Sequence, residues 1–136
     1  MTAVEPGTGV GWRSRFGYRV GVALALSVLV NVVLVGLATV AGVAPGFRPI
    51  SVPPVAVLSA AGVLGAAGTN LVLDQVSEDP DRPFRLVAVA VLVLSFVPDV
   101  LLLSADPAAT VPGVVVLMII HVVVAAACLS LLSDGR

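Results

Sequence analysis

The sequence predicts an all-α, polytopic membrane protein that forms an antiparallel bundle of four transmembrane helices. Hydrophobic residues make up 59% of the 136 residues, and charged residues make up only 11%. The apolar residues gather in four long stretches with short connections between them. A soluble globule of this size would bury only part of its surface, and the few charged side chains would not cover the rest. The bilayer is therefore the expected solvent.

The four apolar stretches cover residues 20–43, 52–73, 84–103 and 111–132. Because a helix rises about 1.5 Å per residue, each stretch is long enough to cross a hydrocarbon core of about 30 Å. Strands of a membrane barrel would instead alternate between apolar and polar residues over about ten positions. These stretches are apolar on every side, so we expect helices, which satisfy their own backbone groups in lipid.

The connections carry residues that end one helix and begin the next. The Pro45-Gly46 pair interrupts the first connection, residues 74–83 form a polar second connection, and the third contains the Asp106-Pro107 pair. All three connections are short enough to place neighbouring helices antiparallel. We expect residues 17–133 to form the transmembrane domain, after a disordered leader over residues 1–16.

The arginines predict the orientation in the cell membrane. Six of the seven lie before the first stretch, around the second connection or at the C-terminus, and only Arg48 lies in the first connection. Since arginine near span ends is retained on the cytoplasmic side, the leader and the tail of residues 134–136 are both expected to be cytoplasmic. A cleaved secretory signal is the alternative for the N-terminus, although residues 20–43 exceed the 7–15 apolar residues typical of a signal.

Composition excludes several classes of function. A net charge of −1 without any lysine offers no basic surface for nucleic acid. Cys128 is the only cysteine, so the chain has no internal disulfide and no cysteine-based metal site. Phosphate-binding, CxxC and HExxH motifs are absent from the sequence. We therefore expect no enzyme activity, no cofactor and no metal, and lipid as the main partner, with a second copy or another membrane protein beside it.

Small residues in the first two stretches predict where helices pack closely. In lipid, glycine, alanine and serine allow close approach, and asparagine can bond across helices. The predicted packing residues are Gly17, Gly21, Ser59, Gly62, Gly65, Ala66 and Asn70. Packing alone would explain these residues, and a substrate path along them is the alternative.

Asp99 is the most informative single residue, because an aspartate at the centre of a span costs about 2.5–3.5 kcal/mol on insertion scales. It lies four residues before Leu103, about 6 Å from the expected end of its helix. Pro98 cannot donate to the carbonyl of Leu94, so we expect a kink with Ser95 as a substitute donor. Asp99 is then an interfacial carboxylate at a kinked helix, a proton or cation site that faces the bundle, or a sign that the boundary of the span is misplaced.

His121 lies ten residues into the fourth stretch, near the middle of the bilayer. A charged imidazolium is disfavoured there, so we expect a neutral ring. Asn31 falls at a similar depth in the first stretch, and a His121 to Asn31 hydrogen bond is the preferred packing interpretation. The alternatives are a proton relay from Asp99 through His121 and a haem site, which would need a second axial ligand.

The chain also resembles a known family through four features: arginines before the first span, a Pro-Pro opening of the second, residues 94–99 (LSFVPD) and residues 118–126 (MIIHVVVAA). It is similar over residues 20–132 to a family of uncharacterised four-span prokaryotic membrane proteins, a domain of unknown function found in actinobacteria and halophilic archaea. The resemblance implies no reaction or ligand. We expect a structural or accessory membrane protein without catalytic activity; the alternative is a small oligomeric proton- or ion-coupled transporter or channel that uses Asp99, His121 and Asn31.

Overall fold

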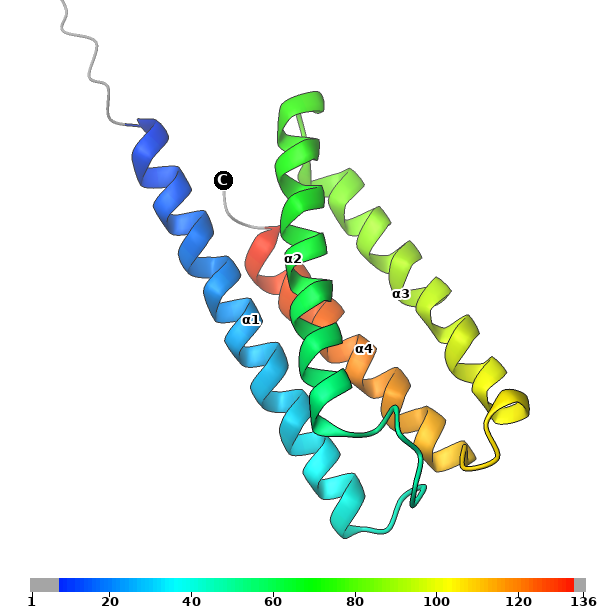
Figure 1. Ribbon diagram of the computed structural model, residues 1–136. Coiled ribbons are helices and arrows are strands. Elements are labelled where there is room, and N and C mark those ends of the chain that lie inside the picture. The colour runs from blue at the N-terminus through cyan, green and yellow to red at the C-terminus, as the bar shows by residue number, and fades with distance from the viewer. Residues whose placement is uncertain (1–7, 134–136) are drawn as a thin grey trace, which may run out of the picture.

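The computed structural model describes residues 8–133, which form four helices that run alternately up and down (Figure 1). These are α1 (Thr8–Val40), α2 (Val52–Val76), α3 (Asp81–Ala105) and α4 (Val111–Leu132). The described part of the chain contains no strand, and each helix is long and apolar enough to cross a membrane. The all-α class and the four-helix bundle are thereby confirmed, and the chain is a multi-pass membrane protein.

Helix α1 begins earlier than the sequence predicts. Residues 8–16 are helical, which contradicts the disorder expected for this part of the leader. Residues 1–7 of the predicted leader and residues 134–136 of the predicted tail lie outside the described part. The glycines near the N-terminus suggested disorder, but Trp12 stacks on Phe16 one turn later, with ring centroids 5.5 Å apart. Phe16 also packs against a buried apolar cluster, and these contacts support the extra helical turns.

The C-terminal ends of α1, α2 and α3 differ from the predicted ones by two to three residues, and α3 begins three residues earlier, at Asp81. The start of α2 and both ends of α4 agree with the prediction. Helix α1 stops at Val40 because Gly42 adopts a left-handed conformation with φ 69°. The amides of Gly42 and Val43 donate to the carbonyls of Thr39 and Ala38, which is the bonding pattern of a glycine-terminated helix. The other changes lengthen α2 to Val76 and α3 to Ala105.

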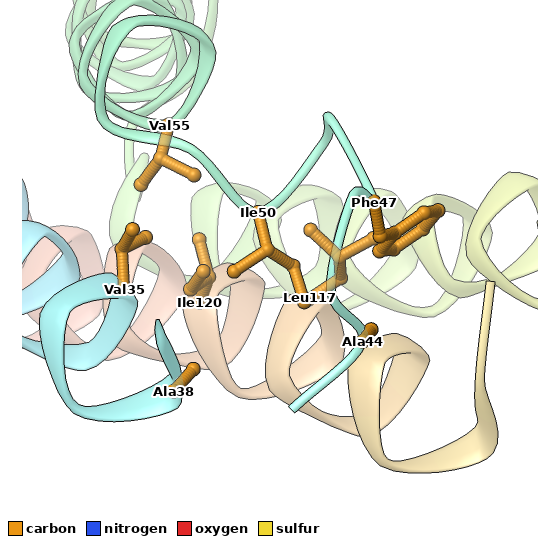
Figure 2. Close-up of a cluster of buried hydrophobic side chains, with 8 residues drawn as sticks. All are labelled: Val35, Ala38, Ala44, Phe47, Ile50, Val55, Leu117 and Ile120. Carbon is orange, nitrogen blue, oxygen red and sulfur yellow. The ribbon is translucent and has the colours of Figure 1, made fainter. Parts of the chain in front are cut away.

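Helices α1, α2 and α4 form the core of the bundle. The buried residues of α1 and of α2 each recur about every four positions. Residues four apart form a ridge along a helix, and two helices commonly pack through such ridges. One apolar cluster lies next to the connection from α1 to α2 (Figure 2) and comprises Val35, Ala38, Ala44, Phe47, Ile50, Val55, Leu117 and Ile120. A second cluster, toward the opposite end, includes Ala23, Val63 and Leu132. Ser27, Asn31 and Ser59 lie between the two clusters along α1 and α2 and form a buried polar layer.

Helix α3 is the outlying element. It packs mainly on α4 and less on α2, and none of its described residues contacts α1. Its buried residues are Phe84, near its start, and Asp99, near its end. Helices α2 and α3 diverge from their connection toward the other end of the bundle (Figure 1). The candidate site lies between α3 and the neighbouring helices α2 and α4.

Candidate functional site

A cavity of about 840 Å³ lies between α2, α3 and α4. This volume is within the range of about 300–1,000 Å³ typical of sites for small molecules. On α3 its lining runs from Phe84 to Leu102, a distance of about 27 Å along a helix, so the cavity extends along most of a bilayer's hydrocarbon core. Most of the lining is aliphatic, with Arg48 from the first connection at one end. The cavity is thus long and apolar, with few polar groups.

Asp99 and His121 meet in the wall of this cavity. Oδ2 of Asp99 lies 3.0 Å from Nδ1 of His121, and both residues line the cavity. Asp99 is only 5% exposed, whereas the side chain of His121 is 35% exposed. The structure therefore places Asp99 against α4 rather than at an interface with water, and it brings together the two ionisable residues that the sequence singled out.

The Nδ1 atom of His121 has two acceptors within reach. Besides Asp99, the carbonyl oxygen of Leu117 lies 2.8 Å from Nδ1. A carbonyl can only accept, so Nδ1 carries a proton and donates it to Leu117. Oδ2 of Asp99 is left without a well-aligned donor despite its short distance to the ring. In the described part of the chain Nε2 has no hydrogen-bond partner, which leaves it available to a molecule in the cavity.

The surroundings of Asp99 differ from the prediction in two respects. Helix α3 continues to Ala105, so Asp99 lies six residues, or about 9 Å, from its end instead of about 6 Å. The hydroxyl of Ser95 donates to the carbonyl of Leu92 at 2.6 Å and not to that of Leu94. A serine in a helix reaches the carbonyls three and four residues before it, but Leu94 is its direct neighbour. Ser95 still lines the cavity one turn from Asp99.

Asn31 is not a partner of His121, contrary to the preferred packing interpretation. Its Nδ2 donates to Oγ of Ser59 at 2.8 Å and to the carbonyl oxygen of Ile120 at 3.4 Å. Asn31 does join α1 to α4, but through the backbone of Ile120, because His121 is turned toward Asp99. Asn31 is fully buried and does not line the cavity, so it stands apart from the Asp99–His121 pair.

The predicted packing residues divide into two groups. At Gly62 an added Cβ would lie 3.1 Å from Cγ1 of Val124, so α2 approaches α4 closely there. Asn70 is buried and donates to the carbonyl oxygen of Leu132 at 3.0 Å. Ser59 is buried against Asn31, and Ala66 packs on the second apolar cluster. These four residues lie at contacts between helices.

The other group makes no close helix contact. An added Cβ at Gly17, Gly21 or Gly65 would meet no atom within 4 Å. Gly17 and Gly21 lie on the face of α1 away from the buried row, and Gly65 lines the cavity instead of a contact. Spacing alone could not separate these glycines from Gly62, because every turn of a small-residue helix offers such a pattern.

The sequence did not identify the cavity itself or several of its lining residues. Arg48, Thr69 and Cys128 line it, yet none of them belonged to the predicted site. The signal that was present is the face of α3 on which Phe84, Ala88, Leu92, Ser95 and Asp99 recur at helical spacing. Within residues 8–133 no three His, Cys, Asp or Glu side chains gather in a group able to hold a metal ion.

The comparison with known proteins gives one result. The profile of a family described as a family of unknown function (DUF6069) matches residues 11–135, which includes all four helices from the second turn of α1 onward. No curated protein and no solved structure matches the chain. The predicted membership in a family of unknown function is confirmed, whereas the prokaryotic source stays a prediction.

Proposed function

We propose a function for this chain, which belongs to the family of unknown function DUF6069. It is a non-enzymatic accessory protein of the membrane whose cavity holds a lipid-soluble molecule. The cavity between α2, α3 and α4 is the binding site, and the Asp99–His121 pair is its polar contact. The single observation that carries this proposal is the contact between buried Asp99 and partly exposed His121 in the wall of a long apolar cavity.

The shape of the cavity favours an elongated, mostly apolar ligand. Aliphatic side chains line it along about 27 Å of α3. Two of its polar groups, Asp99 and His121, lie toward the same end as Arg48, because α3 ends and the connection from α1 to α2 lies at that end of the bundle (Figure 1). A molecule with a hydrocarbon tail and a polar head capable of hydrogen bonding fits this distribution.

The composition of the site supports binding rather than catalysis. A pair of side chains, one acidic and one basic, can hold a polar group or exchange a proton with it. Bond cleavage by acyl transfer would in addition need a nucleophile next to the histidine and donors for an oxyanion. Ser95, the nearest cavity hydroxyl on α3, is bonded to the carbonyl of Leu92.

Photolabelling tests the proposal. We would reconstitute the chain in vesicles that contain a fatty acid with a diazirine group and map the labelled residues by mass spectrometry. We expect the label on Leu92 and Val124, which line the cavity, above that on Val93 and Val97, which are exposed on α3. Equal labelling of both sets would mean that only bulk lipid contacts the protein, and would contradict the proposal.

Two glycine variants of α2 provide the matched control. Gly65 lines the cavity and Gly68 does not, and an added Cβ at either position meets nothing within 4 Å. Gly65→Phe places a ring in the cavity and should reduce the labelling of Leu92 several-fold. Gly68→Phe adds the same ring outside the cavity and should leave the labelling unchanged.

Proton-coupled transport is the second candidate, and the contact between Asp99 and His121 is the observation that favours it. Two groups able to exchange a proton lie 3.0 Å apart at one cavity. If they carry flux, proton uptake into vesicles should occur with the wild type and fall to background with Asp99→Asn at equal protein content. Asn31→Leu should conduct normally, because Asn31 does not line the cavity. Absence of wild-type flux would leave the binding role as the only one of the two.

A further inference from the structure

A second pocket lies at the opposite side of the bundle, between α1 and α4. Its volume is about 530 Å³, and it is lined by Ser14, Arg15, Tyr18, Arg19, Ser130 and Leu131. It shares no residue with the cavity of the proposed function. Four of its six lining residues come from two successive turns of α1, and the other two come from the last turn of α4.

The pocket lies where α1 would enter the hydrocarbon core. The apolar stretch of α1 begins at Val20, the residue directly after Arg19. Arg15 and Tyr18 are exposed on the preceding turn, and Trp12 stacks on Phe16 one turn further out. Aromatic and basic side chains of this kind lie at the level of the lipid headgroups. The pocket is therefore at headgroup depth.

The charges of the pocket are unbalanced. Arg15 and Arg19 are four residues apart, so their guanidinium groups share one face of α1 and repel each other. Among residues 8–133 no acidic side chain lines the pocket, and neither arginine forms an ion pair there. A bound anion would remove this repulsion.

One contact holds Arg19 in place and leaves most of its donors free. Its Nη1 atom donates to the carbonyl oxygen of Leu131 at 3.4 Å, which anchors the guanidinium at the end of α4. A guanidinium has five N–H donors in a planar fork suited to phosphate oxygens. The hydroxyl of Tyr18 is exposed beside it and adds another donor.

From this geometry we propose that the pocket binds the phosphate group of an anionic phospholipid, with Arg15 and Arg19 as its two cationic contacts. Basic pockets between transmembrane helices are a recurrent way of recognising such headgroups. We assign the phosphate group to a lipid because of the depth of the pocket in the membrane. The tails of a lipid bound there would lie beside the apolar part of α1 that begins at Val20. The proposal is independent of any ligand in the larger cavity.

Native mass spectrometry of the full chain tests this site. We would measure the binding of phosphatidylglycerol and of phosphatidylcholine from mixed micelles. The wild type should retain phosphatidylglycerol in preference to phosphatidylcholine, and replacement of both arginines (Arg15→Gln with Arg19→Gln) should weaken its binding roughly 30-fold, as expected for two arginines at a membrane surface. Equal retention of the two lipids by the wild type would overturn the proposal.

Two further variants distinguish binding in the pocket from non-specific electrostatic attraction and from misfolding. Arg13→Gln with Arg82→Gln removes the same charge from residues outside the pocket and should change the binding less than threefold. A loss as large as that of the pocket variant would overturn the proposal. Arg15→Gln alone leaves the contact between Arg19 and Leu131 intact, so it should fold normally and still weaken the binding.

Inorganic phosphate distinguishes a lipid from a free ion. If the headgroup and its tails are recognised together, millimolar phosphate should not displace phosphatidylglycerol. Displacement by phosphate alone would show that the pocket takes a soluble anion, and the assignment to a lipid would be wrong.

Discussion

Asp99 and His121 together carry no net charge when the carboxyl group is protonated beside a neutral ring, or when a carboxylate stands beside a protonated ring. Because Asp99 is buried and its Oδ2 lacks an aligned donor, a carboxylate beside a neutral ring would be costly. The neutral pair is therefore the state that the apolar surroundings favour.

A double-mutant cycle measures how strongly the pair is coupled. Asp99→Ala and His121→Ala should each lower the free energy of unfolding. The double variant should lose less than the sum of the two single losses, and the difference, the coupling energy, should be about 1–3 kcal/mol. This value lies between those of average contacts in membranes and of buried ion pairs. Unfolding in mixed micelles provides the free energies. Asp99→Ala combined with Asn31→Ala is the control, and it should be additive because these residues are not in contact.

At the level of the elements, close approach between helices depends on particular positions and not on small residues in general. Helix α2 meets α4 at Gly62, where Val124 fills the space beside the backbone. Gly62 and Gly65 both border the cavity, but one turn later, at Gly65, an added Cβ would meet no atom within 4 Å. The same residue type therefore has a packing role at one position and leaves open volume at the next.

Replacement of these two glycines by alanine should have opposite effects. Gly62→Ala places a methyl group 3.1 Å from Val124, so the helices must shift, and we expect a loss of about 1 kcal/mol in the free energy of unfolding. Gly65→Ala adds a methyl group to open space and gains helix propensity, so we expect no loss and a gain of up to about 1 kcal/mol. Thermal unfolding in detergent compares the two, and equal destabilisation would show that α2 is packed alike along its length.

At the level of the whole molecule, the alternation of the four helices brings the start of α1 and the end of α4 to the same end of the bundle (Figure 1). The arginines before Val20 and around the second connection cluster at that end, which predicts that it is cytoplasmic. Reporters that are active only in the cytoplasm, fused at Met1 and at Arg136, should both be active. Activity of one reporter alone would contradict the antiparallel arrangement in the membrane.

The fold was largely predictable from sequence because lipid imposes a simple rule: a span must be a helix of about 20 apolar residues. The rotation of each helix was less predictable. Hydropathy marked Asp99 and His121 as costly residues, but only the packing of α3 on α4 shows that they are partners. For the same reason the predicted hydrogen bond between His121 and Asn31 is wrong. The cavity was not predictable, because it depends on the angle at which α3 leaves α2.

The most direct test of the central claim is native mass spectrometry of the chain extracted gently from the membrane in which it was made. The account predicts that the wild type carries an apolar molecule of defined mass, and that Gly65→Phe, which fills the cavity, loses it while Gly68→Phe retains it. A wild-type protein without a bound molecule, or one whose bound molecule survives Gly65→Phe, would contradict the claim that the cavity is a binding site.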